Sequence, residues 1–250
     1  MVVRLPSGCE YSVQVEKENR WLPRLAPFLP LEVPRPLALG EPTAEYPWKW
    51  SVYGWIDGQT AAADRIIDMR DFATRLAAFL IALHGIDTAG GPAPGVHNFH
   101  RGGSLAVYDA ETRVAITVLE DDINAAGARR TWEAALEGKW NMAPVWVHGD
   151  ISPGNLLLVN GRLNAVLDFG LIAIGDPACD LSIAWTLFRG ETRYLFRQML
   201  ALDEQTWARG RAWILWKALI VAAKLAQTNA VEMQEPLQVI RDVLAEGRGS

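Results

Sequence analysis

The sequence has few cysteines and no uninterrupted apolar run long enough to cross a membrane. Its 250 residues contain two cysteines, Cys9 and Cys179, without the close spacing of a metal site. We therefore expect reduced thiols rather than a disulfide framework. The longest apolar run, residues 214–226, is interrupted by Lys217 and Lys224, whereas a membrane span needs about 20 mostly apolar residues. This run predicts a buried helix instead.

Basic residues are also in deficit, with 24 lysines and arginines against 29 aspartates and glutamates. The net charge of −5 disfavours a nucleic-acid partner, because phosphate backbones select basic surfaces. The first ten residues lack the apolar core of a secretory signal peptide. A chain that is 50% apolar and 21% charged can bury a sizeable core. The sequence therefore predicts a soluble, cytoplasmic protein without nucleic-acid or membrane partners.

Hydrophobic periodicity divides the chain into a small strand-containing N-terminal part and a larger helical C-terminal part. Strands are predicted over 1–5 and 50–56, with a helix over 13–29 between them. An amphipathic helix is predicted over 64–84, followed by a long glycine-rich loop over 85–104. Further helices are predicted over 130–138, 177–188, 192–200, 204–226 and 232–245. The expected fold class is α+β.

A β-hairpin is predicted in the middle of the chain. Asn160-Gly161 lies between two short apolar strands, and this dipeptide is the strongest short-range hairpin signal. As a two-residue turn it makes Asn155 face Val166, so that Asp168 lies just beyond that pair at the same end of the hairpin. Local structure alone is therefore expected to bring an amide oxygen and a carboxylate together.

Asp150 is presented nearby, five residues before Asn155 and at the end of the apolar strand 145–147. Neighbouring hard oxygen ligands such as those of Asn155 and Asp168 suit Mg²⁺, which binds one or two carboxylates together with substrate phosphates. A separate carboxylate beside the metal suits a general base for an attacking hydroxyl. These are the parts that phosphoryl transfer requires of a protein.

The motifs of this segment resemble the catalytic-loop and metal-loop pair of kinases. They are His148-Gly149-Asp150-x-x-x-x-Asn155 and Asp168-Phe169-Gly170, followed by Gly175-Asp176-Pro177-x-x-Asp180. The first motif, with glycine between histidine and aspartate, and the third motif are similar to the corresponding motifs of the aminoglycoside phosphotransferase family. The resemblance covers nearly the whole chain and implies a protein-kinase-like two-lobe fold. Residues 1–58 would form a partial nucleotide-binding lobe and hinge, and 59–250 a helical lobe with the catalytic loop and substrate site.

The resemblance also implies roles for individual residues of the catalytic segment. Asp150 would be the catalytic base, and Asn155 and Asp168 would hold Mg²⁺. Asp180 would be structural and brace the catalytic loop. The implied cofactors are Mg²⁺ and ATP or GTP.

Four further positions match the nucleotide site of the family. Glu18 on the first helix matches the glutamate that pairs with the phosphate-contacting cation, with Glu16 left as an alternative of less suitable helical phase. Arg4 occupies the place of the phosphate-binding lysine, and it keeps the charge with a different geometry. The backbone of Gly54 and Ile56 falls at the hinge and would hydrogen-bond the nucleobase edge.

Only three residues precede Arg4, which leaves no room for the glycine-rich phosphate loop of kinase folds. We expect a sequence that is N-terminally truncated or that begins at an internal methionine. The first strand would then present an uncovered edge, which favours self-association as a homodimer.

The implied function is transfer of the γ-phosphate of ATP or GTP to a hydroxyl of a small molecule, with an aminoglycoside-type antibiotic as the first acceptor to consider. Choline, homoserine, a macrolide or a sugar-amine are alternative acceptors. Two other readings stay open, a non-catalytic kinase-like binding protein and a metal-dependent hydrolase that uses His148, Asp150 and Asp168. Acidic residues in the substrate cleft would favour a polyamine, and the available ones are Glu191, Asp203, Glu204 and Glu232.

The glycine-rich loop is a further candidate for function because long loops near a site often close over ligands. Its His97 and His100 have the spacing of a metal pair but lack an evident third ligand, so contact with substrate is the preferred interpretation. The eleven tryptophans, Trp213 and Trp216 among them, are expected to be mostly core residues, a few of which could stack on a sugar ring.

Overall fold

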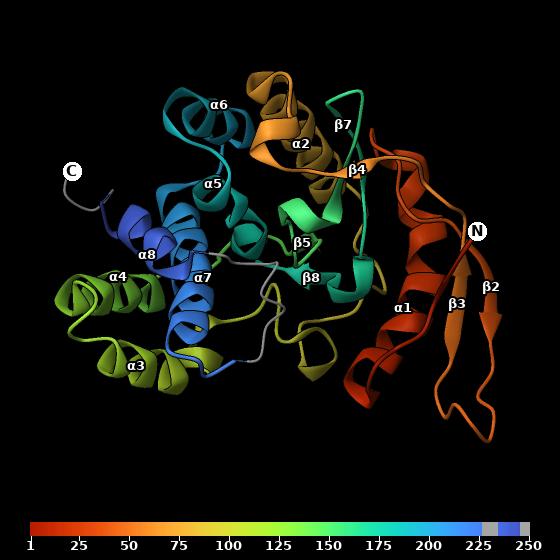
Figure 1. Cartoon of the computed structure of the whole chain (residues 1–250), viewed down its shortest axis with the longest axis horizontal. Helices are drawn as coiled ribbons and strands as arrows, with labels where there is room; N and C mark the ends of the chain where they lie inside the picture. Colours follow the sequence, from red (N-terminus) through yellow and green to blue (C-terminus); the bar gives the residue numbers. More distant parts are fainter. Residues whose placement is uncertain (227–234, 246–250) are drawn as a thin grey trace.

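The computed structural model describes residues 1–226 and 235–245. It combines three small antiparallel sheets with many helices, which confirms the α+β fold class. In Figure 1 the N-terminal strands and α1 (Cys9–Leu25) lie at one end of the molecule and the C-terminal helices at the other. The two remaining sheets lie between them. Within the described ranges, no helix has both the length and the apolar character that a membrane span requires.

The N-terminal sheet contains β1 (Val2–Arg4), β3 (Trp50–Tyr53) and β2 (Pro36–Gly40) in that spatial order. β1 is therefore an edge strand, and Val2 and Val3 on it are exposed. α1 begins directly after the extended Gly8 and ends four residues earlier than predicted, because Pro27 just beyond it cannot continue the helix. The predicted strand over 50–56 ends at Tyr53, where the chain leaves the sheet.

The predicted hairpin consists of β6 (Leu156–Val159) and β7 (Arg162–Val166), and β4 (Gln59–Thr60) pairs with the outer side of β6. Asn160 and Gly161 both have positive φ, at 50° and 72°, as a tight two-residue hairpin turn requires. A separate pair, β5 (Val145–Val147) and β8 (Ala173–Gly175), brackets the hairpin in sequence.

The predicted register of the hairpin is wrong by one residue at its far end. Leu156, and not Asn155, faces Val166, because a bulge interrupts the ladder at Asn164. The backbone carbonyl of Asn164 accepts a hydrogen bond from the N–H of Glu32 at 3.0 Å. A segment far away in sequence thus draws one residue out of the pairing, which no local pattern reveals.

The C-terminal part is helical and centred on α7 (Glu204–Ala222), which contacts α3, α4 and α8 and is buried over most of its surface (Figure 1). Asp68 caps α2 through the N–H groups of Arg70 and Asp71, so this helix starts five residues later than predicted. The other helices are α2 (Met69–His84), α3 (Asp109–Val118), α4 (Ala125–Glu137), α5 (Ile183–Thr186), α6 (Gly190–Leu200) and α8 (Pro236–Ala245).

Three further helical predictions need correction, and the helix α3 was not predicted. The helix predicted over 130–138 begins at Ala125, and the one predicted over 177–188 is a 3₁₀ segment followed by the short α5. α7 ends at Ala222 rather than at 226 because Lys224 takes a left-handed conformation, with φ 56°. The first residues of the helix predicted over 232–245 fall outside the described part. Single 3₁₀ turns connect the elements at Ala26–Phe28, Ala63–Arg65, Val96–Asn98, Leu105–Tyr108, Pro153–Asn155, Phe169–Leu171 and Pro177–Leu181.

Candidate active site

The loop that follows β5 is held by a fully buried carboxylate. Asp180 accepts hydrogen bonds from the backbone N–H groups of His148 at 2.8 Å and Gly149 at 2.7 Å. Burial raises the pKa of Asp180, and these backbone hydrogen bonds oppose the rise. The brace expected of Asp180 is therefore present as a pair of hydrogen bonds that fix the backbone just before Asp150.

His148 ties the same loop to the end of the hairpin. Its Nε2 lies 2.9 Å from the carbonyl oxygen of Leu167, and its Nδ1 accepts from the N–H of Asp150 at 3.2 Å. Since one partner is an acceptor and the other a donor, these bonds select the neutral tautomer with hydrogen on Nε2. The buried ring of His148 thereby links the backbone of Leu167, just before Asp168, to the backbone of Asp150.

Asp150 is oriented by two neighbours. The Asn155 amide nitrogen donates to the Asp150 carbonyl at 3.0 Å and to its Oδ2 at 2.8 Å. Lys217 Nζ on α7 lies 3.6 Å from Oδ1. Burial alone would raise the pKa of Asp150, but the charges of Lys217 and Arg101 hold it below its usual value. The side chain is therefore an ionised, positioned carboxylate that can accept a proton.

On the other side of the hairpin end, four side chains from different elements form a connected cluster. Arg4 Nη1 donates to Glu18 Oε1 at 3.0 Å, and Arg4 Nη2 donates to Asp168 Oδ1 at 2.6 Å. The Tyr53 hydroxyl donates to the other oxygen of Glu18 at 2.5 Å. Glu18 is buried, whereas Glu16 forms a surface ion pair with Lys49. Glu18 is thus the glutamate that meets Arg4.

This cluster lines a cavity of about 400 Å³, called here the Arg4 cavity. Asn155 and Asp168 line it on the hairpin side. Gly54 and Ile56 line it on the β3 side, where the Gly54 N–H donates to the Arg35 carbonyl at 2.9 Å. The sequence-predicted site residues apart from Asp150 therefore share one cavity, and they are Arg4, Glu18, Gly54, Ile56, Asn155 and Asp168.

The donor set of the Arg4 cavity fits a magnesium ion. The amide nitrogen of Asn155 is engaged by Asp150, which leaves its amide oxygen as the remaining acceptor. The Asp168 side chain is 41% exposed and stands at a left-handed backbone position, with φ 58°. Nowhere in residues 1–226 or 235–245 do three or more histidine, cysteine, aspartate or glutamate side chains gather as a metal cluster. One carboxylate and one amide oxygen match Mg²⁺, which takes its other ligands from phosphates and water.

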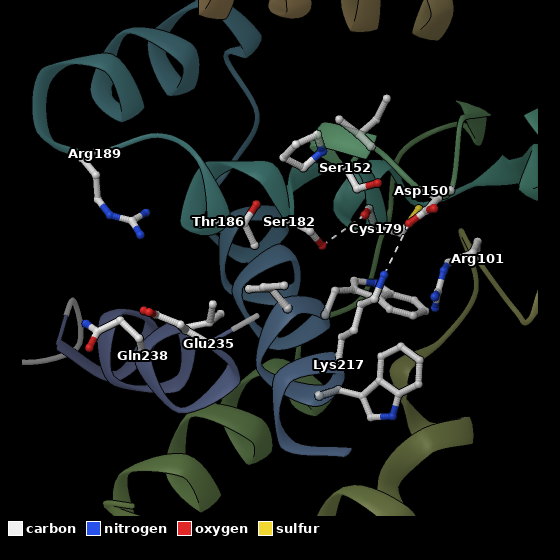
Figure 2. A pocket seen from close by; sticks show the side chains of 17 residues that line it. Arg101, Asp150, Ser152, Cys179, Ser182, Thr186, Arg189, Lys217, Glu235 and Gln238 are labelled. Carbon is white, nitrogen blue, oxygen red and sulfur yellow. Dashed lines mark hydrogen bonds and ion pairs between the residues drawn. The ribbon is translucent and has the colours of Figure 1, made fainter. Parts of the chain in front are cut away.

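A second cavity, of about 280 Å³, lies on the opposite side of Asp150 and is called here the Lys217 cavity. Figure 2 shows the Asp150 carboxylate and the Lys217 amine pointing toward each other at its edge, with Arg101 beside them. Trp213 and Trp216 of α7 form part of its wall. Asp150 thus faces one cavity while Asn155, its hydrogen-bond partner, lines the other.

Sequence reasoning missed the residues that define the Lys217 cavity. Trp213 and Trp216 are buried, as expected of core tryptophans, and they also form part of the cavity wall. Lys217 lies within an otherwise apolar run, and a charge on a buried helix was the available signal. Arg101 belongs to the glycine-rich loop, so this loop does reach a cavity, through its arginine rather than its histidines.

Three of the four acidic residues considered for the substrate cleft lie away from this cavity. Glu191 forms a surface ion pair with Arg70, and Glu204 forms one with Arg197. Asp203 caps α7 by accepting from the N–H of Thr206 at 2.9 Å. The remaining candidate, Glu232, lies outside the described residues. His97 of the glycine-rich loop instead contacts Lys17 Nζ on α1 at 3.1 Å.

Two glycines determine where Arg101 lies. A Cβ atom on Gly175 would stand 2.1 Å from the carbonyl oxygen of Gly102, which is far inside van der Waals contact. Gly102 has a φ of 79°, and its carbonyl accepts from the N–H of Asp176 at 2.8 Å. The loop that carries Arg101 can therefore lie against β8 only because both residues lack a side chain.

The chain matches one family of known proteins and superposes on several solved structures. The model of the phosphotransferase enzyme family matches residues 1–213. No curated protein sequence matches this chain. Among solved structures, the GDP and kanamycin complex of APH(2")-IIia superposes with a TM-score of 0.70 at 17% identity, covering 98% of this chain and 86% of that one.

Two other solved structures superpose over a similar share of the chain. The GDP complex of wild-type aminoglycoside 2'-phosphotransferase-IIIa has a TM-score of 0.68 at 17% identity and covers 98% of this chain and 86% of that one. The macrolide 2'-phosphotransferase MphH from Brachybacterium faecium has a TM-score of 0.57 at 23% identity and covers 97% and 82%. At these identities the likeness establishes the protein-kinase-like fold.

Proposed function

This chain belongs to the phosphotransferase enzyme family, and from its site we propose that it transfers the γ-phosphate of ATP or GTP to a hydroxyl of a small molecule. The observation that carries the proposal is the position of Asp150 between two cavities. It lines the Lys217 cavity, while its hydrogen-bond partner Asn155 lines the Arg4 cavity. A nucleotide in the Arg4 cavity and an acceptor in the Lys217 cavity would meet at this carboxylate.

The proposed reaction is an in-line displacement at the γ-phosphorus. The acceptor hydroxyl gives its proton to the Asp150 carboxylate as its oxygen forms a bond to phosphorus. The bond from phosphorus to the β,γ-bridging oxygen breaks, and its electron pair leaves with the nucleoside diphosphate. Asn155 and Lys217 hold the carboxylate in place for the acceptor proton. The lowered pKa of Asp150 keeps this group ionised at neutral pH.

The nucleotide contacts follow from the Arg4 cavity. Arg4, positioned by Glu18, would bind phosphate oxygens. The Gly54 carbonyl and the Ile56 N–H would bind the nucleobase edge, since the Gly54 N–H is already used by Arg35. Asn155 and Asp168 would hold Mg²⁺, which when bound neutralises charge on the phosphates. The nucleotide would therefore lie where residues 1–58, the proposed N-lobe, meet the helical remainder.

Titration calorimetry with Mg²⁺–ATP and Mg²⁺–GTP, together with nucleoside diphosphate release in the presence of pooled hydroxylated acceptors, tests the proposal. The wild type should bind at least one nucleotide. Asp150→Asn should retain that binding and lose turnover by about 10²- to 10⁴-fold, the usual contribution of a general base. Asp122→Asn, an exposed aspartate away from both cavities, is the matched control and should keep its turnover.

Two outcomes would contradict the proposal in different ways. Absence of nucleotide binding by the wild type would favour a non-catalytic kinase-like binding protein. Wild-type turnover by Asp150→Asn would leave the kinase reaction standing and show that the proton goes elsewhere.

A further inference from the structure

Among the described residues, cations outnumber carboxylates around the Lys217 cavity. Arg101, Arg189 and Lys217 line it, against the two carboxylates of Asp150 and Glu235. Figure 2 shows Glu235 beside Gln238 at the end of the cavity away from Asp150. The reacting end of the cavity therefore combines the proposed base with two cations.

These cations differ in how their charge is matched. Arg189 forms an ion pair with Asp242 at 2.9 Å, and Lys217 lies beside Asp150. No carboxylate of residues 1–226 or 235–245 lies within ion-pair distance of Arg101. Its Nη1 is buried and has no hydrogen-bond partner in the same ranges. This donor of the guanidinium is therefore unsatisfied, which is costly in a partly buried site.

Arg101 is held by aromatic rings instead. Its guanidinium carbon lies 5.0 Å from the ring centre of Trp213 and 5.1 Å from that of Trp216. Trp216 is itself fixed, because it stacks on Tyr108 at 4.0 Å and donates from Nε1 to Glu111 at 2.6 Å. Arg101 is therefore a preorganised cation whose position does not depend on a protein carboxylate.

The described lining offers little to a polycationic acceptor. An acceptor with several ammonium groups would meet the cations Arg101 and Lys217 beside Asp150, and the other carboxylate of the described lining, Glu235, lies at the far end. The cavity, at about 280 Å³, is also at the small end of the range for ligand pockets.

Resting on the kinase function proposed above, we propose that the acceptor is a compact hydroxylated compound with one anionic group, a carboxylate or a phosphate, bound by Arg101 with Lys217. Its carbon skeleton would lie against Trp213 and Ile214, which form the apolar part of the wall. A polycationic amino sugar would be a poor acceptor. Arg101 would thus determine which compounds are phosphorylated without itself touching the transferred phosphoryl group.

The test compares matched acceptors with the full chain and its preferred Mg²⁺–nucleotide. Each hydroxy acid is paired with its amide, each sugar phosphate with the free sugar, and kanamycin represents the amino sugars. Binding is measured by calorimetry and turnover by product formation. We expect kcat/KM for an anionic acceptor to exceed that for its neutral counterpart at least about tenfold, the usual effect of one charged hydrogen bond. Comparison of the hydroxy acids with the sugar phosphates identifies which anion is bound.

Substitutions assign the effect to Arg101. Arg101→Gln should raise KM for the anionic acceptor about 10- to 100-fold and abolish the preference over the neutral analogue, with little change in nucleotide affinity. Arg101→Lys should restore part of it, because the charge returns without the planar donor geometry. Arg70→Gln, which removes a surface arginine paired with Glu191, is the matched control and should keep the preference.

Preference for kanamycin or for neutral acceptors by an enzyme that binds nucleotide would overturn this inference and leave the kinase function intact. The same holds if Arg101→Gln keeps the wild-type preference, or if no anionic compound of the panel binds or reacts. Absence of nucleotide binding would remove the proposed function and this inference together.

Discussion

The Arg4 cavity is formed largely by strand ends, backbone and a chain of paired charges, whereas the Lys217 cavity is formed by side chains from helices and loops far apart in the sequence. The first contains a chain of hydrogen bonds that runs from Tyr53 through Glu18 and Arg4 to Asp168. In the second, Arg101 rests on indole rings and has no carboxylate partner among the described residues. The charged side chains of the first cavity hydrogen-bond one another, while the second holds a guanidinium with a buried nitrogen that has no hydrogen-bond partner in the described part of the chain.

This difference indicates which side of the site can vary. Residues of the Arg4 cavity depend on one another, so a change at one leaves a buried partner unsatisfied. Residues of the Lys217 cavity come from helices and loops and are linked by fewer hydrogen bonds between side chains, so a change at one leaves fewer buried partners unsatisfied. We expect substitutions on the two sides to separate into effects on nucleotide use and effects on acceptor use.

The largest expected effect that would sharpen this comparison is that of Asp168→Asn. This change removes the charge that pairs with Arg4 and the proposed metal ligand. Turnover should fall on the order of a thousandfold and Mg²⁺-dependent nucleotide binding should be lost, while acceptor binding stays within about twofold. Calorimetry with each ligand separately measures both. A loss of acceptor affinity as large as the loss of nucleotide affinity would show that the two cavities are not independent.

An intermediate effect is expected for Glu18→Gln, with Glu16→Gln as its control on the same helix. The amide oxygen of the new side chain could still accept from Tyr53, but Arg4 would lose the charge of a buried partner. The loss of a charged hydrogen bond should raise KM for the nucleotide about 10- to 100-fold and lower Tm. Glu16 pairs with Lys49 at the surface, so its variant should change neither quantity appreciably. Similar behaviour of the two variants would mean that the cluster is not what positions Arg4.

The smallest expected effect concerns pH. Burial lowers the pKa of Lys17, next to Glu18 on α1, to about 8 from an ordinary value of 10.5. Between these values the unfolded chain binds a proton that the folded chain does not, so the free energy of unfolding should rise as pH increases from about 8 to 10.5. Lys17→Met should lose this contribution to the slope.

Urea unfolding of the wild type and of Lys17→Met at a series of pH values measures the difference. Lys49→Met, which removes the half-buried lysine of the ion pair with Glu16, should keep the wild-type slope over this pH range. Parallel curves for Lys17→Met and the wild type would show that Lys17 is solvated in the folded protein and that α1 does not bury this charge.

Only the hairpin side of the Arg4 cavity could be predicted from local structure. Asn155 and Asp168 lie at the same end of a hairpin whose turn follows from Asn160-Gly161, whereas Arg4, Glu18, Gly54 and Ile56 were assigned from the family resemblance. Even there the register was wrong by one residue, because the bulge at Asn164 depends on the distant Glu32. The roles assigned to these residues stay predictions until the substitutions are made.

The Lys217 cavity could not be predicted in the same way. Arg101, Asp150 and Lys217 are far apart in the chain, and only the packing of α7 against the catalytic loop brings them together. Apolar periodicity identified α7 as buried but says nothing about which of its faces borders a cavity. The helix α3 was missed for a related reason, since its buried side is only Thr112, Ala115 and Ile116, too short a stripe to stand out.

The contact between Gly102 and Gly175 has a consequence for directed evolution. Because the two backbones touch, a methyl group at 175 would displace the whole loop, whereas a new side chain at 101 would change only the cavity wall. A library aimed at new acceptors should therefore randomise positions 101, 213 and 217 and keep both glycines fixed. Variants from such a library would then differ in acceptor specificity and keep the same backbone conformation in the loop.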